Sequence, residues 1–244
     1  HHVKEFLEVG GFPETLSIDR RFFRDLLQGY IDVVIYRDIM ERYNVTNVHV
    51  LRELIKFCLQ ASSSLVSMNK IYHRFKSQGK AIGKNSLYEF MTYLEDAYCI
   101  FSVPLYAFSM RKQMINPKKI YPVDQGFITA YTVKPEYEEA ARLKNAVFCH
   151  LRRTTDNIFY YKTKTGKEVD FLTVSPNGAR QLYQVCTSIA DEATRGREIS
   201  SIIQAMEELR LKKAFLVTMN NKEVINTKTG VIHCFPAWQW FLEY

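Results

Sequence analysis

Four polar side chains in the C-terminal half have a spacing that suits metal chemistry. Glu168 and Asp170 stand two residues apart in one run, and Gln184 and Cys186 stand two apart in a later run. Because side chains alternate between the two faces of a β-strand, each pair projects from one side of its strand. A hairpin that joins the strands would gather all four. Carboxylates gathered in this way hold a divalent cation that activates water for hydrolysis.

The residue types fit this chemistry less well than their spacing does. Gln184 is a neutral amide, whereas Mg²⁺ prefers carboxylate and water oxygens. Cys186 cannot supply the cation of a catalytic lysine. The residues alone therefore leave two interpretations open: a metal-dependent nuclease that uses Glu168 and Asp170, and an ordinary polar hairpin.

The elements around these residues are expected to be short strands joined by hairpins. Turn signals, a Thr-Gly pair and a Pro-Asn-Gly triplet, separate the apolar runs. A helix should precede the strands, and a helix and a further strand should follow them. The expected boundaries are helix 136–153, strands 158–163, 168–174 and 181–187, helix 191–209 and strand 213–219. This part is thus predicted to be an α/β domain that starts near residue 125.

The N-terminal half has helical periodicity instead. Apolar residues recur at intervals of three and four, Asn47 and Ser67 are suited to cap helices, and a polar, basic loop is expected at 109–118. Three helices followed by a hairpin outline a winged helix, whose third helix enters the major groove in DNA-binding cases. The expected elements are helices 19–40, 47–60, 68–77 and 86–97 and strands 99–108 and 119–123. The fold class is therefore α+β, with a winged-helix part at 19–124.

The charge of the chain is concentrated in one segment. The chain carries 33 Lys and Arg against 26 Asp and Glu, and residues 70–119 hold nine of those cations against three acids. Such a segment favours a polyanion, because bound phosphates release counterions. A solvated basic face and a protein partner remain alternatives. The residues expected to lead nucleic-acid binding are Lys84, Asn85, Arg111, Lys112 and Lys118.

Several classes of site are not expected in this sequence. The sequence has no run of 18 apolar residues, so no membrane span is predicted. Its five cysteines are scattered, which is typical of free thiols in a reducing cytoplasm rather than of a metal site. The segment 79–86 has three residues between its glycines instead of the four of a phosphate-binding loop, and Asn85 stands where Ser or Thr would reach Mg²⁺. We therefore expect no cofactor in this chain and a cytoplasmic location.

A set of short motifs, taken together in order, resembles a known family. The chain is similar to the C-terminal part of a prokaryotic AAA-type ATPase family in which a domain of unknown function, DUF4143, follows the ATPase module. The resemblance extends from about residue 5 to residue 219. The residues that carry it are Gly10-Gly11-Phe12-Pro13-Glu14, Arg37-Asp38-Ile39, Tyr93-Leu94-Glu95-Asp96-Ala97-Tyr98, Lys119-Ile120-Tyr121-Pro122-Val123-Asp124-Gln125-Gly126, Asn145-Ala146-Val147-Phe148, Glu168-Val169-Asp170-Phe171, Gln184-Val185-Cys186 and Arg197-Glu198.

The resemblance implies a domain order and a fold. Residues 1–18 would end an ATPase lid, residues 19–124 would form the winged helix, and residues 125–244 would form a DUF4143 domain with a fold similar to the PD-(D/E)xK nucleases. An N-terminal ATPase domain, which would hold ATP and Mg²⁺, would belong to the parent protein and not to this chain.

The resemblance also implies that the nuclease site is degenerate. Lys144 stands where the fold usually takes its first metal-binding acid, Asp170 matches the second acid, and Gln184 and Cys186 replace an acid and a lysine. The loss of several parts of one catalytic unit leaves little activity. We therefore expect a non-catalytic recognition module of an ATPase, with an active Mg²⁺-dependent nuclease and a protein-interaction module as the alternatives.

Overall fold

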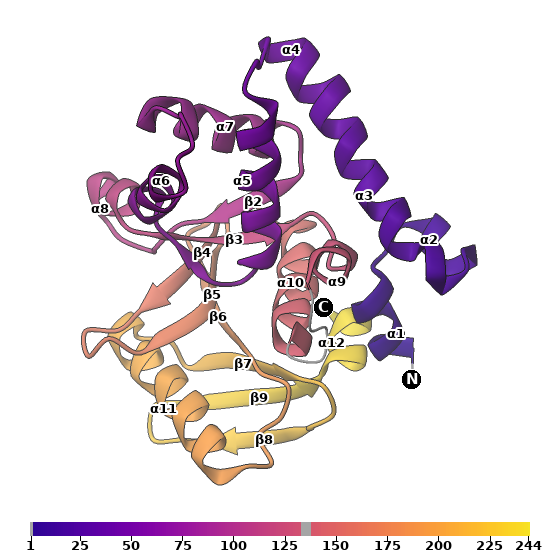
Figure 1. The fold of residues 1–244 in the computed structure, drawn as a ribbon. Helices are drawn as coiled ribbons and strands as arrows, with labels where there is room; N and C mark the ends of the chain where they lie inside the picture. Colours follow the sequence, from indigo (N-terminus) through magenta and orange to yellow (C-terminus); the bar gives the residue numbers. More distant parts are fainter. Residues whose placement is uncertain (1, 133–137) are drawn as a thin grey trace. The chain divides into compact units, whose positions relative to one another are not determined.

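The protein is described by a computed structural model that covers residues 2–132 and 138–244 (Figure 1). The chain divides into two compact units, each of which draws on two stretches of sequence. The N-terminal unit comprises His1–Ser102 and Asn116–Asn145, and the C-terminal unit comprises Val103–Ile115 and Ala146–Tyr244. The mixture of helices and sheets places the protein in the predicted α+β class.

The N-terminal unit is mainly helical, with a small sheet. Its elements are α1 (His2–Val9), α2 (Pro13–Ser17), η1 (Arg20–Phe22), α3 (Phe23–Val33), η2 (Val34–Met40), α4 (Glu41–Tyr43), α5 (Val48–Gln60), β1 (Leu65–Val66), α6 (Met68–Ser77), α7 (Lys84–Asp96), β2 (Ile100–Val103), β3 (Lys118–Pro122), α9 (Gly126–Tyr131) and the start of α10 (Glu139–Arg152). The first residues of the predicted helix 136–153 lie outside the described residues.

The helix predicted over 19–40 is present, but its winding changes along its length. It begins as the 3₁₀ turn η1, continues as α3 and becomes the π-helix η2. The buried residues Leu27, Ile31, Ile35 and Ile39 follow one another at intervals of four. An α-helix turns such a row by about 40° at each step. A π-helix is wound more widely, so it keeps the later isoleucines on the buried face.

Two capping residues were expected at the starts of helices. The Asn47 side chain accepts a hydrogen bond from the Val50 amide at 3.4 Å, as predicted. Ser67 is the N-cap residue of α6, but its side chain makes no capping bond. The helix nevertheless begins at Met68 because its apolar face, with Ile71 and Phe75, is buried in the core.

One part of the predicted hairpin is wrong. The segment expected as a loop at 109–118 contains the helix α8 (Met110–Ile115). Ser109 caps this helix, since its hydroxyl accepts from the Lys112 amide at 3.4 Å. The sequence after Ser109 has good helix formers and lacks glycine and proline up to Pro117, which is the signal that the loop assignment overlooked.

The two ends of the N-terminal unit are joined by one carboxylate. Asp124 accepts a hydrogen bond from the Gly11 amide and another from the Gly126 amide, each at 2.7 Å. Gly10 has φ of +83°, and a Cβ there would lie 1.8 Å from the Asp124 carboxylate. Burial raises the pKa of Asp124, and the two amide donors oppose that shift. The turn at Gly10-Gly11 is thus held against the start of α9.

The C-terminal unit is built around a six-stranded mixed sheet with the order β4-β5-β6-β7-β9-β8. β4, β5 and β6 pair antiparallel, β7 runs parallel to β6 and β9, and β8 returns antiparallel to β9. The elements are α8, the end of α10, β4 (Ile158–Lys162), β5 (Glu168–Val174), β6 (Arg180–Val185), α11 (Glu192–Leu209), β7 (Lys213–Thr218), β8 (Glu223–Asn226), β9 (Val231–Pro236) and α12 (Ala237–Glu243).

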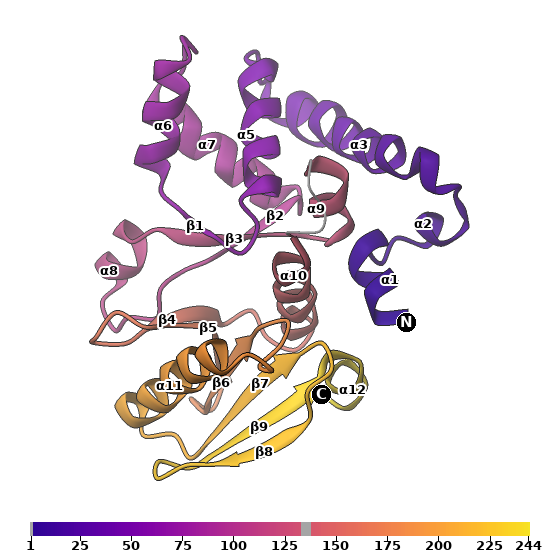
Figure 2. The ribbon, with the colours of Figure 1, turned by 60° about the horizontal axis from the view of Figure 1, so that its bottom comes forward.

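One face of this sheet is covered by α11, as both ribbon views show (Figures 1 and 2). Ile202, Met206 and Leu209 of α11 pack on Leu182 and Leu216 from the strands. The strand predicted at 168–174 has these bounds in the structure, and the other strands predicted for this unit differ by one or two residues at their ends. The strand predicted at 99–108 is shorter than expected, since β2 ends at Val103. β8, β9 and α12 were not predicted.

The close packing of Gly126 leads to a stability prediction for the Asp124 clamp, by which we mean the Asp124 carboxylate with its hydrogen bonds to the Gly11 and Gly126 amides. An alanine Cβ at Gly126 would lie 2.6 Å from the Val9 carbonyl oxygen and 2.9 Å from the Asp124 carboxylate. We expect Gly126→Ala to lower the free energy of unfolding by about 1–3 kcal/mol, because overpacking must be relieved by backbone shifts. Urea denaturation followed by circular dichroism measures this.

Gly29 provides the matched control. It lies inside α3, and an alanine methyl at this position would have no other atom within 4 Å. Gly29→Ala should therefore raise stability by up to about 1 kcal/mol, because alanine is the better helix former. Equal stabilities for the two variants would contradict the proposed role of the clamp.

Candidate functional site

The structure brings together three of the polar residues of the C-terminal unit. Asp170 on β5 is buried, and its Oδ2 accepts from the backbone amide of Val185 on β6 at 3.1 Å. The Asp170 amide in turn donates to Oε1 of Gln184 at 3.0 Å. The other end of Gln184, Nε2, donates to Oε2 of Glu198 at 2.5 Å. The Gln184 side chain therefore connects the backbone of β5 to the carboxylate of Glu198, while the Asp170 carboxylate connects β5 to the backbone of β6.

Glu198 is the residue of this cluster that sequence reasoning did not assign. It lies on α11, its side chain is mostly buried, and Arg197 pairs with it at 3.0 Å. The motif Arg197-Glu198 was among those that carry the family resemblance, but its side chains could not be placed by spacing alone. The helix that covers the sheet supplies a residue that the hairpin prediction could not include.

The face of the sheet on which Glu168 lies cannot be derived from simple strand alternation. Val169 and Leu172 both belong to the apolar cluster beneath α11, although they are three positions apart. A register irregularity between β4 and β5 at this point accounts for the change of face. Glu168 itself stands opposite Lys162 in the register of β5 and β4.

The remaining predicted residues have less chemistry to offer. Cys186 is buried in the apolar cluster beneath α11, and its backbone amide donates to the Val217 carbonyl at 3.1 Å. Lys144 lies on α10 in the stretch that belongs to the N-terminal unit. A buried thiol is a small, mainly apolar side chain, so Cys186 adds packing rather than charge at this position.

The donor set does not fit a catalytic divalent cation. Oε1 of Gln184 is turned to a backbone amide, Oδ2 of Asp170 accepts from another, and Glu198 is shared between an amide and a guanidinium. Within residues 2–132 and 138–244, no group of three His, Cys, Asp or Glu side chains is arranged to hold a metal ion. The cluster can join β5, β6 and α11 by hydrogen bonds, and we derive no metal-dependent step from it.

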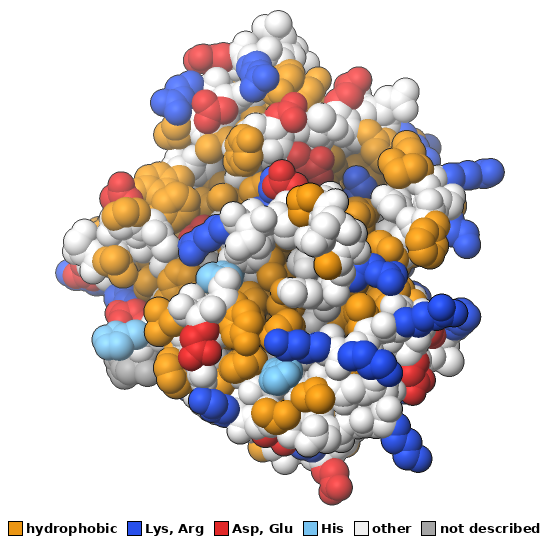
Figure 3. All heavy atoms as spheres, turned by 180° about the vertical axis from the view of Figure 1, so that it is seen from behind, with side chains coloured by type: hydrophobic (Ala, Val, Ile, Leu, Met, Phe, Trp, Pro, Cys, Tyr) orange, Lys and Arg blue, Asp and Glu red, His pale blue; other side chains and the backbone are white. Residues whose placement is uncertain are grey.

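The predicted nucleic-acid-binding residues fall into both units. Lys84 and Asn85 are exposed in the first turn of α7, and Lys118 is exposed at the start of β3, all in the N-terminal unit. Arg111 and Lys112 are exposed on α8, in the C-terminal unit. On the face in Figure 3, Lys and Arg side chains stand among exposed apolar ones.

Not every cation of the basic segment belongs to the surface. Lys119 is buried in β3, and Lys80 pairs with Glu53 at 3.6 Å. The sequence count of nine cations in residues 70–119 therefore overstates the charge that a polyanion would meet.

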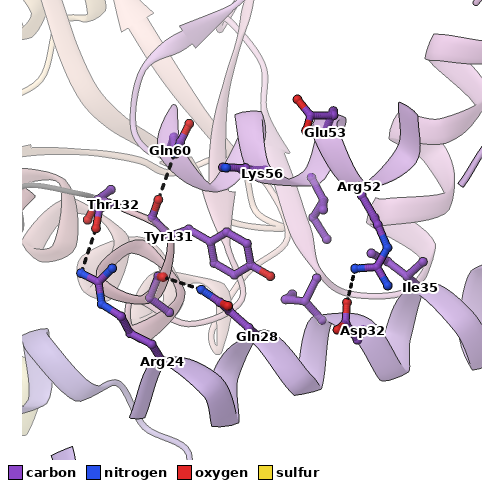
Figure 4. A pocket seen from close by; sticks show the side chains of 13 residues that line it. Arg24, Gln28, Asp32, Ile35, Arg52, Glu53, Lys56, Gln60, Tyr131 and Thr132 are labelled. Atoms are coloured by element: carbon purple, nitrogen blue, oxygen red, sulfur yellow. Dashed lines mark hydrogen bonds and ion pairs between the residues drawn. The ribbon is translucent and has the colours of Figure 1, made fainter. Parts of the chain in front are cut away.

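A polar cavity of about 400 Å³ lies in the N-terminal unit between α3, α5 and α9 (Figure 4). Arg24, Gln28 and Gln60 line it, and each donates to a backbone carbonyl at the end of α9, at 2.9, 3.1 and 3.0 Å. These carbonyls have no partner within the helix, so the side chains complete its C-terminus. These three side chains of the cavity therefore have a structural role at the end of α9.

A second hollow of about 570 Å³, in the same unit, is mainly apolar and brings several of the quoted motifs together. Its lining includes Phe12, the pair Arg37-Asp38, Tyr98 and Val123, which come from four separate motifs. Arg37 and Asp38 are bonded to one another at 3.1 Å. The order of these motifs along the sequence therefore reflects the construction of a single pocket, which spacing alone did not reveal.

Comparisons with known proteins identify two domains in the chain. Residues 1–137 match DUF8612 and residues 141–240 match DUF4143, each described as a domain of unknown function. An uncharacterized protein of Methanocaldococcus jannaschii is 31% identical over 254 residues, which is 100% of this chain and 56% of that protein. An uncharacterized protein of Haemophilus influenzae is 26% identical over 168 residues, 69% of this chain and 42% of that protein.

The chain thus spans about half the length of these curated relatives. No solved structure matches it. Among the helices of the described residues, none has both the length and the apolar character needed to cross a membrane.

The hydrogen-bonded chain through Gln184 leads to a second prediction. In Gln184→Glu the new carboxylate would face Glu198 without a donor between them, and like charges in a buried site destabilise. We expect the free energy of unfolding at neutral pH to fall by about 1–3 kcal/mol. Millimolar Mn²⁺ should raise the unfolding midpoint of this variant more than that of the wild type, because a third carboxylate joins the cluster.

Gln181→Glu is the control, since Gln181 is exposed on the same strand. Thermal unfolding of both variants with and without Mn²⁺ makes the comparison. A Gln184→Glu protein with wild-type stability and no response to Mn²⁺ would count against the arrangement described above.

Proposed function

The chain belongs to the DUF8612 family, and we propose that it is the non-catalytic recognition module of a larger AAA-type ATPase and binds nucleic acid through α7. The observation that carries this proposal is the exposed face of α7. Lys84, Asn85 and Tyr88 are exposed there, while Leu87, Phe90 and Leu94 are buried on the opposite face. A helix fixed by its apolar side presents its polar side for binding.

The exposed side chains have the chemistry of nucleic-acid recognition. A lysine pairs with backbone phosphate, an asparagine can form two hydrogen bonds to adenine, and a tyrosine offers a hydroxyl and a ring face. Lys84 and Asn85 lie in the first turn of α7, and the N-terminal residues of a recognition helix are those that contact base edges.

The surrounding elements support a winged-helix arrangement for residues 19–124. The sheet has the order β1-β3-β2, and β1 pairs antiparallel with β3. The strand β1 lies between α5 and α6 in the chain, and β2 and β3 follow α7. Three helices with a sheet of this connectivity are consistent with α7 as the recognition helix.

For the DUF4143 domain we propose a degenerate nuclease-like fold. Its support is the chain order α10, β4, β5, β6, α11 and β7, with three antiparallel strands followed by a parallel one. The hydrogen bonds of Gln184 support loss of catalysis, because they occupy the groups that a metal ion would need. This proposal assigns the ATP and Mg²⁺ site to another part of the parent protein, since the matched residues make up 56% and 42% of the two curated relatives.

Binding should depend on salt and on the basic residues of both units. We expect the affinity for duplex DNA to fall steeply with salt, and the double variant Lys112→Ala/Lys118→Ala to lower the slope of log K against log salt by about two, since each lost phosphate contact removes about one. Fluorescence anisotropy at several salt concentrations measures the slope.

Two further variants refine this test. Asn85→Ala should reduce affinity with little change in the slope, because Asn85 is uncharged. Lys228→Ala, which removes an exposed charge elsewhere, should leave both quantities near the wild type. If the wild-type chain binds a protein partner but neither DNA nor RNA at low salt, the protein-interaction alternative replaces this proposal.

The isolated chain is expected to cleave neither plasmid DNA nor ATP. Metal-dependent cleavage needs charged ligands for the ion and a group that assists water, and Gln184 and Cys186 supply neither. Plasmid incubated with the protein in millimolar Mg²⁺ or Mn²⁺ should stay supercoiled, and ATP should remain intact. Nicking that disappears in Asp170→Ala would establish the nuclease alternative.

A further inference from the structure

Four large apolar side chains are presented to solvent on and beside α8. Phe108, Met110, Met114 and Ile115 are 93, 68, 73 and 71% exposed. Exposed apolar residues scattered singly need no explanation, but four within eight residues form a patch, and such patches mark interaction surfaces.

The patch has a firm support within the C-terminal unit. Tyr106 donates its amide to the Tyr160 carbonyl of β4 at 2.8 Å, and its ring packs edge-on against Phe159 with centroids 5.5 Å apart. Gln113 of α8 donates its side-chain amide to the Ala107 carbonyl at 2.7 Å. The apolar side chains therefore stand on a capped helix whose leading segment is attached to a sheet edge.

The segment that carries the patch is positively charged, whereas the adjoining β4–β5 turn is mixed, since Glu208 of α11 accepts from the Lys164 amide at 3.0 Å. Between Asp96 and Asp124 the chain contains no acidic residue, and Arg111 and Lys112 lie within α8 itself. The β4–β5 turn carries the exposed Lys164 and Lys167, and this turn lies at the same end of the unit as α8 in both ribbon views (Figures 1 and 2). The partner that fits such a surface is negatively charged on its outside and has apolar groups that the patch can reach.

We propose that Phe108 and the apolar side chains of α8 form a wedge that inserts between stacked bases of a bound nucleic acid, while Arg111 contacts its backbone phosphate. Proteins that bend DNA insert Phe, Ile and Met between base steps and recover the unstacking cost through the added contacts. The proposal rests on the proposed nucleic-acid binding, and it adds a distortion of the bound strand.

The same features fit a nucleic acid better than a membrane surface. α8 has only six residues, whereas helices that lie in a lipid interface usually bury an apolar face along many more residues. The segment is also continuous with β2 and β3, the two strands that follow α7. The wedge requires no fixed position of one unit relative to the other.

The test uses the whole chain and duplexes that carry 2-aminopurine, whose fluorescence rises when the base leaves the stack. The wild type should raise this fluorescence at one or more steps of the bound duplex. Phe108→Ser/Met114→Ser should abolish the rise and weaken binding by roughly tenfold, with the salt slope unchanged, because no phosphate contact is lost. Arg111→Ala should instead lower the slope by about one and keep the rise.

Val224→Ser/Leu242→Ser is the matched control, because both side chains are exposed and apolar and lie elsewhere in the same unit. It should behave as the wild type. Circular dichroism and thermal unfolding check that all variants fold, which is expected since the changed side chains are largely exposed.

Each other outcome rejects the wedge and shows whether the proposed nucleic-acid binding is rejected with it. Binding with a steep salt slope but no change in 2-aminopurine fluorescence retains the proposed function and rejects the wedge. Absence of binding to both DNA and RNA rejects both. Binding to vesicles of phosphatidylglycerol and phosphatidylcholine that is lost in Phe108→Ser/Met114→Ser assigns the patch to a lipid surface instead.

Discussion

The pairing of Asp124 with the amides of Gly11 and Gly126 is the constraint on which the N-terminal unit depends. It joins residues 113 positions apart, so the helices between them must return the chain to its starting point. A charged acceptor strengthens both hydrogen bonds, and they offset the desolvation that raises the pKa of Asp124. The glycines at 10 and 126 are needed because a Cβ at either position would collide with this carboxylate. Two motifs that look unrelated in the sequence are the two halves of one contact.

The C-terminal unit uses a polar cluster for a comparable purpose. Asp170, Gln184 and Glu198 link two strands and the helix above them through hydrogen bonds that satisfy buried groups. Gln184 accepts from the backbone of β5 and donates to the Glu198 carboxylate on α11, so both ends of its amide are satisfied inside the domain.

Local patterns in the sequence predicted most of the elements, and non-local contacts account for the errors. β5 was predicted with its observed bounds because turn residues flank an apolar run, and α6 followed from its apolar face. The face of Val169 could not be predicted, since the irregularity between β4 and β5 depends on both strands. β8 was missed because it is short and half exposed, and β9 was missed because its position depends on parallel pairing with β7. Glu198 joins the candidate site only because α11 packs over the sheet, and helix packing is invisible to residue spacing.

The distribution of positive charge shows why a count of cations is a poor guide to binding. Lys119 is buried and Lys80 is paired, so fewer charges reach solvent than the sequence suggests. The rest are divided among α6, α7 with β3, and the segment around α8. Each group alone is small for a nucleic-acid site. The strands β2 and β3 connect α7 with the segment around α8. If nucleic acid binds as proposed, contact by one of these groups would place the other at a high effective concentration. Two modest surfaces on one chain can then bind more tightly than either alone, and the apolar side chains of α8 would add contacts that salt does not weaken.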